Sequence, residues 1–382
     1  MAAAAQDLQG TDLLRDFGRG DARAREESWR YSKMALRALS QQDFVAADTH
    51  AALPDDLRAR FDWPQTRGRR VVFVNGAFSE THSDISKIGT AFTAGEAPGN
   101  TWSIRIDGEV EEPVHVVYVS VPSAQPSRWQ AQVSVAIVNG HSGVIEQHLG
   151  VAGTSVLGSL QRQFELAAGT QLDVVSLCEL PESAALYRCV DARVGAKAVL
   201  RATHVLLGGR LQRLDLQVEL VGEQARLQSR GVFALRGREH ADTQLDICHV
   251  AQNTASDIVW RGVADQRARG IFHGAITVAQ GADGADAQLS NKNLLLSALA
   301  EIDTQPVLEI YADEVKAAHG ATVGQIDERA LFYLRSRGIP EAEAKRLLVG
   351  AFCEAALDRI AQPWLREHIA GLLAPRLAEA NA

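Results

Sequence analysis

Regularly spaced short apolar runs constrain the fold of this chain more than any other feature. Between Arg70 and about Ala312 such runs recur, separated by Gly, Asn and Asp. In the second half, seven strand centres are predicted near residues 217, 233, 247, 260, 277, 295 and 309, so that neighbouring centres lie 13 to 18 residues apart. This spacing is longer than tight hairpins need and too short for intervening helices. It leaves two folds open, a solenoid of parallel strands and a β-sandwich.

The individual runs have the pattern of strands with one buried face. Over Leu214–Leu220, apolar residues alternate with charged or polar ones, which is the period of two expected of a strand. Val71–Val74, Val114–Val121 and Gln132–Val138 are strand-like as well. One stretch differs, because the leucines and the phenylalanine of Gly158–Ala168 have helix-like spacing, and there we expect a short helix or an insertion in the β region.

Both ends of the chain are predicted to be helical. Near the N-terminus, Glu26–Leu39 contains neither Gly nor Pro, and we expect a helical cap there. Near the C-terminus, Asp327 is a suitable helix N-cap, Gly338 fits the position just past that helix, and Pro340 fits the first position of the next. The predicted organisation is an N-terminal helical region over residues 1–65, a β core over 66–318 and a C-terminal helical region over 319–382.

Composition is that of an ordinary globular protein. The 382 residues are 46% hydrophobic and 23% charged, and the formal net charge of −8 argues against nucleic acid or an anionic membrane as the main partner. No apolar run reaches the ~18 residues of a transmembrane helix, and the first residues lack the pattern of a secretory signal, so we expect a cytoplasmic protein. Four scattered cysteines, without a CxxC pair, are expected to be reduced and largely structural: Cys178, Cys189, Cys248 and Cys353.

No common catalytic motif is present. The sequence contains no G-x-x-x-x-G-K-[ST], no G-x-G-x-x-G and no H-E-x-x-H. Gly140–Gly143 resembles a hydrolase turn but does not satisfy G-x-S-x-G, and a strand rather than a helix is predicted after it. Arg210, Arg213 and Asp215 are predicted to form a salt bridge on the surface of the β region. These motifs therefore give no support for nucleotide hydrolysis or for a serine hydrolase.

One long stretch resembles a known family. The run E-I-Y-A-D-E-V-K-A-A-H-G-A-T-V-G-Q-I-D, followed by L-F-Y-L-R-S-R-G-I within Leu308–Ile339, resembles the signature of SufD, the scaffold subunit without ATPase activity in the Suf iron–sulfur cluster assembly system. Near the N-terminus, the segment E-x-W-R-Y-S from Glu27 to Ser32 is similar to a SufD element as well. The resemblance favours the solenoid over the sandwich and implies a mainly β fold, a right-handed parallel β-helix flanked by helical regions.

The resemblance also implies partners. SufD-like chains pair with the paralogue SufB through the β-helix, and their C-terminal helices bind the SufC ATPase. It implies no catalysis by the chain itself, and a homodimer is expected as a form of the isolated chain. The residues expected to contact SufC are Phe332, Tyr333, Arg335, Arg337 and Phe352.

His319 is the one candidate metal ligand. A neutral imidazole suits iron, and we expect this residue just after a strand, beside a turn bracketed by Gly320 and Gly324. The alternative is that His319 bonds the carboxylate of Asp313 or Glu314 and holds the turn. The resemblance favours an iron or cluster ligand at the interface with SufB.

The thiol expected of a cluster site is missing from the chain. Many SufD-like chains carry a cysteine where Ala317 stands, and Gln288–Leu296 contains no cysteine either. Because thiolates are the usual ligands of iron–sulfur clusters, we expect the chain alone to bind no cofactor. A cluster is expected only transiently, in the complex with SufB.

Two other functions remain open. The first is a carbohydrate-active β-helix enzyme that uses Asp313, Glu314 and Asp327 as acid and base. Its disadvantage is an aromatic content of only 6%, since sugar-binding grooves are usually lined with aromatic residues. The second is a structural solenoid that associates with itself.

Overall fold

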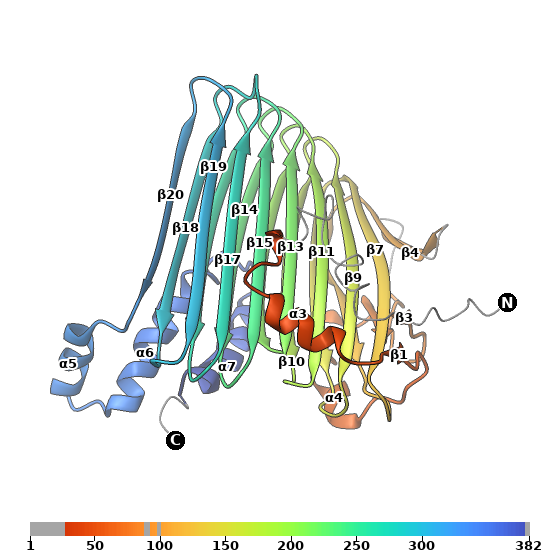
Figure 1. Ribbon diagram of the computed structural model, residues 1–382. Coiled ribbons are helices and arrows are strands. Elements are labelled where there is room, and N and C mark those ends of the chain that lie inside the picture. Colours follow the sequence, from red (N-terminus) through yellow and green to blue (C-terminus); the bar gives the residue numbers. More distant parts are fainter. Residues whose placement is uncertain (1–26, 88–91, 98–100, 379–382) are drawn as a thin grey trace.

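The computed structural model describes residues 27–87, 92–97 and 101–378 (Figure 1). The fold is mainly β and consists of two ten-stranded sheets that face each other. Along most of the chain, successive strands alternate between the sheets, so that odd-numbered strands form one sheet, here sheet A, and even-numbered strands form the other, sheet B. The chain therefore winds as a solenoid.

The strands have these bounds. Sheet A runs in the order β19 (Glu301–Ile310), β17 (Arg269–Val278), β15 (His240–His249), β13 (Leu211–Leu220), β11 (Ala184–Val194), β9 (Val156–Leu166), β7 (Ser127–Asn139), β5 (Thr101–Asp107) and β4 (Phe92–Ala97), with β1 (Val45–Ala46) paired to β7. Sheet B runs in the order β20 (Lys316–Gly324), β18 (Asp286–Leu295), β16 (Ala255–Ala264), β14 (Arg226–Leu235), β12 (Val199–Gly208), β10 (Gln171–Leu180), β8 (His141–Gly150), β6 (Val110–Ser120), β2 (Arg70–Val74) and β3 (Ala77–Phe78).

The strands pair in parallel from one turn of the solenoid to the next. Gln212 on β13 lies beside Ala241 on β15, and Ala241 lies beside Gly270 on β17, with no shift of register. Among the described strands, only the hairpins β2–β3 and β4–β5 are antiparallel. A β-sandwich is built from antiparallel sheets, so this pattern confirms the predicted parallel β-helix.

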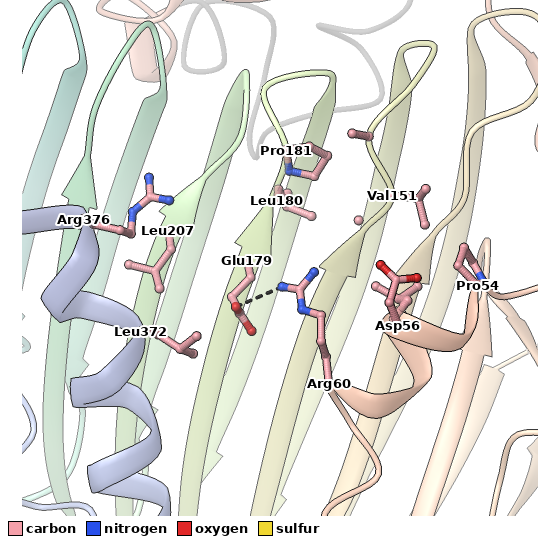
Figure 2. A pocket seen from close by; sticks show the side chains of 13 residues that line it. Pro54, Asp56, Arg60, Val151, Glu179, Leu180, Pro181, Leu207, Leu372 and Arg376 are labelled. Atoms are coloured by element: carbon pink, nitrogen blue, oxygen red, sulfur yellow. Dashed lines mark hydrogen bonds and ion pairs between the residues drawn. The ribbon is translucent and has the colours of Figure 1, made fainter. Parts of the chain in front are cut away.

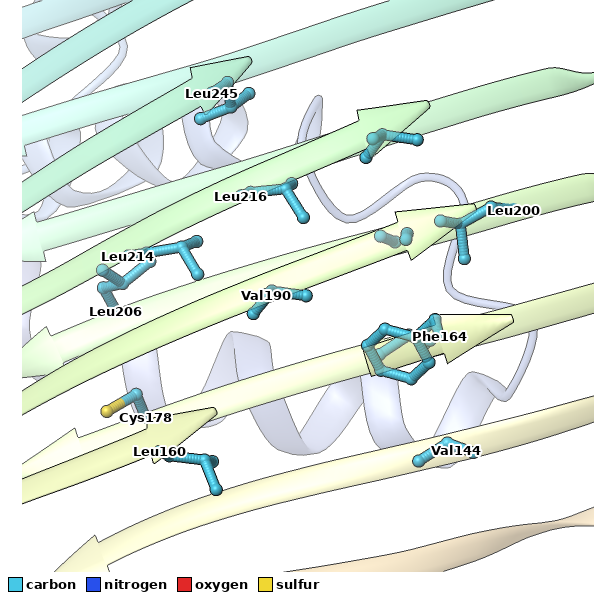
Figure 3. Packing of buried hydrophobic residues seen from close by; sticks show 14 of the residues in the cluster. Val144, Leu160, Phe164, Cys178, Val190, Leu200, Leu206, Leu214, Leu216 and Leu245 are labelled. Atoms are coloured by element: carbon cyan, nitrogen blue, oxygen red, sulfur yellow. The ribbon is translucent and has the colours of Figure 1, made fainter. Parts of the chain in front are cut away.

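The hydrophobic core lies inside the solenoid. Side chains on the inward face of each strand stack on their counterparts in the neighbouring turns; Figure 3 shows Leu160, Phe164, Val190 and Leu200 among them. Because the inward face repeats at every turn, a single apolar column extends along the molecule. Cys178 belongs to this column, and burial raises the pKa of its thiol to about 12, consistent with a structural role.

The seven predicted strand centres of the second half are confirmed. They fall within β13 to β19. The predicted helix over Gly158–Ala168 is wrong, because this stretch forms strand β9. Its inward face carries Leu160, Arg162, Phe164 and Leu166, and Arg162 is fully buried in an ion pair with Glu146. Because Arg162 is charged but lies at an inward position, the sequence of β9 does not show the regular alternation of apolar and polar residues that is typical of a strand.

The end of the β region lies further along the chain than the sequence suggested. A turn between Gly320 and Gly324 was expected, and residue 318 was expected to end the core. Instead β20 continues to Gly324 and pairs with β18 along its length. The inward positions of β20 include Ala317 and Ala321, whose small side chains give no apolar alternation.

The described helices lie outside the solenoid. They are α3 (Lys33–Ser40), α4 (Asp55–Ala59), the 3-10 helix η1 (Pro64–Thr66), α5 (Glu328–Ser336), α6 (Glu341–Glu354) and α7 (Pro363–Ala378). Asp327 caps α5 as predicted, since its carboxylate accepts a hydrogen bond of 2.8 Å from the Arg329 amide. Gly338 follows α5 with a φ of +87°, also as predicted, whereas Pro340 is the N-cap of α6 rather than its first residue. Of the predicted helix Glu26–Leu39, Glu26 lies outside the described residues.

The N-terminal segment covers part of sheet A, and in Figure 1 α3 crosses the odd-numbered strands. Arg213 places its guanidinium 4.2 Å from the ring centre of Trp29 and forms ion pairs with Asp215 at 2.5 Å and Asp242 at 2.8 Å. Ser32 donates a further hydrogen bond to Asp242. The Arg213–Asp215 pair therefore exists, but the prediction that it lies on the surface is wrong, because the N-terminal segment buries it.

Helices α6 and α7 cover the outer face of sheet B. Val349, Cys353 and Ile369 pack there against Val205 and Val232 in a second core, outside the solenoid. Burial raises the pKa of the Cys353 thiol to about 12, so this cysteine too is structural. Both faces of sheet B are thus largely buried from β8 to β14, and most residues of these strands are buried.

Two glycines at turns between strands allow a test of the close contact between successive turns of the solenoid. Gly208 and Gly169 both have positive φ, at +81° and +74°. A Cβ at Gly208 would overlap the Leu180 carbonyl oxygen of the preceding turn, whereas a Cβ at Gly169 meets nothing within 4 Å. We expect Gly169→Ala to lower the free energy of unfolding by about 1 kcal/mol, through backbone strain alone. Gly208→Ala should lower it by about 3 kcal/mol. Chemical denaturation measures both, and equal losses would contradict the turn-to-turn contact.

Candidate partner interface at the open end of the solenoid

Strands β19 and β20 form the last turn of the solenoid. They end sheets A and B, and no strand within residues 27–87, 92–97 and 101–378 pairs with their outer edges. Figure 1 shows α5 leading away from the end of β20 rather than folding over it. The outer edge therefore presents backbone N–H and C=O groups in two strands, an arrangement that readily pairs with another sheet. We call this turn, with Leu299 and Tyr311 beside it, the open end.

The open end is exposed and partly apolar. The residues of β14 and β16, inside the solenoid, are mostly buried, whereas most of β20 is exposed. Large apolar side chains at the open end have exposed fractions of 62% for Leu299, 42% for Ile310, 62% for Tyr311 and 41% for Val323. Apolar residues gathered beside free strand edges are typical of an interaction surface.

The inward face becomes polar as it approaches the open end. Asn293 Nδ2 donates to Asn291 Oδ1 at 2.6 Å and to the Thr322 carbonyl at 3.0 Å, while the Thr304 hydroxyl donates to Asn291 Oδ1 at 2.7 Å. Both asparagines are buried. These bonds connect β18 to β19 and β20 and hold the last turn in place.

His319 lies on this inward face, in the middle of β20. The register sets it beside Leu289 of β18, and Ala317 and Ala321 share its side of the strand. Its side chain is exposed and makes no hydrogen bond or ion pair with any described residue. The alternative in which Asp313 or Glu314 holds the imidazole therefore has no contact to support it.

His319 is a single ligand without companions in its own chain. Among the described residues, no group of three or more His, Cys, Asp or Glu side chains lies close enough together to hold a metal ion. Ala317 precedes His319 by two residues on the same side of the strand, so the cysteine that many SufD-like chains carry there would point the same way. His319 is therefore exposed to solvent rather than enclosed in a metal site formed by the described residues.

Helix α5 presents two aromatic side chains to solvent. Leu331 anchors the helix with 5% exposure, whereas Phe332 and Tyr333 are 71% and 57% exposed. The Arg337 guanidinium lies 5.3 Å from the ring centre of Tyr333, and Arg335 pairs with Glu341 of α6 at 3.3 Å. Phe332, Tyr333 and Arg335 of α5, together with Arg337 at its C-cap, are exposed and accessible to a partner.

The fifth residue expected at a partner contact lies elsewhere. Phe352 belongs to α6, is partly buried against the second core, and has the Arg261 guanidinium 5.7 Å from its ring centre. It therefore packs largely within its own chain. Sequence spacing could not separate it from the exposed aromatic residues, because that distinction depends on how α6 rests on sheet B.

A separate groove lies on the outer face of sheet B. Figure 2 shows it between α4 and α7, where Arg60 reaches toward Glu179 at 2.9 Å. Its volume is about 440 Å³. Its lining contains no Ser, Cys, His or Tyr, and of its two carboxylates, Asp56 and Glu179, the second is paired with Arg60.

The three carboxylates of the carbohydrate-enzyme hypothesis are not brought together. Asp313 and Glu314 precede β20, and Asp327 follows it and caps α5. The nine residues of β20 stand between them, a length of about 30 Å. Acid and base carboxylates of glycosidases lie about 5 to 10 Å apart. This geometry contradicts that hypothesis.

No described helix is long and apolar enough to cross a bilayer.

Fold and site together define a parallel β-helix with one open end, a lone histidine on the last strand and exposed aromatic residues on the helix that follows. Comparisons with known proteins agree with this class. The family model described as "SUF system FeS cluster assembly, SufBD core domain" matches residues 124–352. This match covers more than half of the chain. The chain belongs to the SufBD family of iron–sulfur cluster assembly proteins.

Individual relatives carry the same description. An iron–sulfur cluster assembly SufBD family protein of Synechocystis is 27% identical over 380 residues, which is 88% of this chain and 83% of the relative. The iron–sulfur cluster assembly protein SufD of Escherichia coli is 37% identical over 172 residues, which is 45% of this chain and 41% of the relative. A SufBD family protein of Mycobacterium tuberculosis is 28% identical over 275 residues, or 70% of this chain and 68% of the relative.

Proposed function

We propose that this chain is a scaffold subunit of an iron–sulfur cluster assembly complex and has no catalytic activity of its own. In this proposal the open end pairs with the corresponding β-helix of SufB, and the C-terminal helices bind the SufC ATPase. The observation that carries the proposal is the pair of free edges on β19 and β20, with apolar side chains beside them. A second β-helix with a similar free edge would continue both sheets and bury those side chains.

The two proposed contacts are mechanically connected. Only three residues, 325–327, separate the end of β20 from the start of α5. A displacement of α5 by SufC is therefore transmitted directly to β20, which carries His319. We propose that ATP-driven movement of SufC alters the joint between the two β-helices in this way.

His319 is proposed as one ligand of the iron or cluster that the complex assembles. It is exposed on the inward side of the last strand and therefore faces the proposed joint. Iron–sulfur clusters are held mainly by thiolates, and the described part of the chain places none beside His319. The remaining ligands would come from SufB, which makes the cluster transient cargo rather than a resident cofactor.

Charged substitutions at the open end test the pairing. Tyr311→Asp and Val323→Asp place a carboxylate where the proposal buries an apolar surface, so each should weaken binding to SufB at least tenfold, or about 1.4 kcal/mol. Titration of the purified chains measures the affinity. Met34→Asp is the matched control, because Met34 is 76% exposed on α3, away from the open end. Wild-type affinity in both open-end variants would refute the proposed interface.

The contact with SufC is tested on α5. Phe332→Asp should lower affinity for SufC at least tenfold and leave the melting temperature unchanged, because Phe332 is 71% exposed in the isolated chain. Phe352→Asp provides a contrast, since it should lower the melting temperature by disturbing the packing of α6 on sheet B. Pull-down and calorimetry measure the two effects. If Phe332→Asp binds SufC like the wild type, α5 is not the contact.

The role of His319 is tested by iron content. In the complex purified without oxygen, His319→Ala should leave subunit stoichiometry unchanged and reduce bound iron at least severalfold, because a ligand is lost. His50→Ala is the control, since His50 is also exposed but lies far from β20 in the sequence. Unchanged iron in His319→Ala would contradict a ligand role while leaving the scaffold proposal intact.

A further inference from the structure

A cluster of polar side chains lies inside the solenoid, where most inward positions are apolar. Glu146 on β8, Ser176 on β10 and His204 on β12 form one row across sheet B, because the register sets each beside the next. Arg162 on β9 and Arg188 on β11 reach toward them from sheet A. All five are buried, and together they line a small internal cavity. Its volume of about 10 Å³ has room for about one water-sized sphere.

The two arginines differ in how they are satisfied. Arg162 forms an ion pair with Glu146. Arg188 is only 2% exposed, and its Nη1 donates to the Ser176 hydroxyl at 2.8 Å. Its Nε and Nη2 have no hydrogen-bond partner among the described residues, and none of the described carboxylates forms an ion pair with it. A buried guanidinium with two free donors is among the most costly groups to leave uncompensated in a protein interior.

The neighbouring titratable groups do not neutralise Arg188. Burial and the Arg188 charge lower the pKa of His204 to about 3, so its imidazole is neutral at physiological pH. Burial, followed by the charges of Arg188 and Arg162, also lowers the pKa of His148, which lies near the cluster on β8. Burial raises the pKa of the Cys178 thiol to about 12, so it carries no negative charge. Two guanidiniums and one carboxylate leave one net positive charge.

The free donors converge on one place. The Ser176 hydroxyl accepts from Arg188 and so has its own proton available to donate. Neither ring nitrogen of His204 has a hydrogen-bond partner among the described residues, and the neutral ring carries one N–H. Arg188 contributes two further donors without a partner, its Nε and Nη2 groups. Among Arg188, Ser176 and His204 the one unused acceptor is the second nitrogen of the neutral imidazole, which carries no negative charge. This charged donor set therefore fits an anion, and the size of the cavity restricts it to one that resembles a water molecule.

We propose that this cavity binds a single small monovalent anion of halide size, held by the Arg188 guanidinium together with the Ser176 hydroxyl and the His204 imidazole. The anion supplies the missing negative charge inside the solenoid and links sheet A to sheet B at mid-length. Sulfate and acetate consist of several heavy atoms and do not fit a space for one. The site is independent of the open end and of the proposed partners.

Bromide is the direct probe. Crystals of the full chain are soaked in sodium bromide, and diffraction data are collected at the bromine absorption edge. We expect an anomalous peak within hydrogen-bond distance of Arg188 and Ser176. Density at this place without anomalous signal identifies a water molecule only and overturns the proposal, as does an absence of density.

Thermal unfolding shows whether the anion binds in solution. At constant ionic strength, replacing sodium acetate by chloride or bromide should raise the melting temperature of the wild type by a few degrees and then saturate, because a ligand bound only to the folded state stabilises it. Arg188→Met should fold and lose this halide dependence. Arg193→Met removes an exposed arginine of the same strand and should keep it.

A second variant covers the case in which Arg188→Met fails to fold. Ser176→Ala keeps the buried charge and removes one donor, so it should shift the halide midpoint to higher concentration at least severalfold. A wild-type melting temperature that is the same in acetate and halide overturns the proposal, even if bromide appears in the crystal, because it identifies binding at crystal concentration only.

Discussion

The structure depends on parallel pairing between successive turns of the chain. Each strand of the solenoid uses its two edges, one toward the preceding turn and one toward the next, and its inward side chains stack in the same register. A solenoid built in this way has no internal reason to stop. At the N-terminal end, the antiparallel hairpins β2–β3 and β4–β5 interrupt the repeat. At the other end the outer edges of β19 and β20 pair with no described strand, so the pairing that builds the fold also leaves an exposed strand edge there.

Charged residues inside the solenoid follow from the same geometry. Away from the open end, an inward position is buried whatever residue occupies it, so Arg162 and Arg188 must be compensated within the column. Arg162 is compensated by Glu146, and Arg213, outside the column, by Asp215 and Asp242 beneath the N-terminal segment. The Arg162–Glu146 and Arg213–Asp242 pairs join different strands, whereas Arg213 and Asp215 share β13. They fix how the strands and the N-terminal cap fit together, beyond what apolar stacking specifies.

The sequence predicted those parts of the fold in which each strand carries its own pattern. Strand β13 alternates clearly, and the nearly even spacing of the apolar runs from β13 to β19 gave the solenoid once the family resemblance had excluded a sandwich. Strand β9 was mistaken for a helix, because Arg162 occupies an inward position and its partner Glu146 lies on another strand. Strand β20 was missed because its small inward residues reveal a strand only through pairing with β18. The place of His319 on a strand could be found only from the register with β18, and the exposure of Phe332 relative to Phe352 could be found only from the packing of α6.

The central claim is that the last turn of this solenoid is completed by a second chain. Hydrogen–deuterium exchange, measured by mass spectrometry on the isolated protein and on the protein with SufB, tests it most directly. Free strand edges exchange quickly, whereas strands paired on both sides are protected. The account predicts that peptides covering β19 and β20 exchange fast in the isolated chain and become at least tenfold slower with SufB, while β13 and β14 stay unchanged. Unaltered exchange in β19 and β20 within a confirmed complex would contradict it.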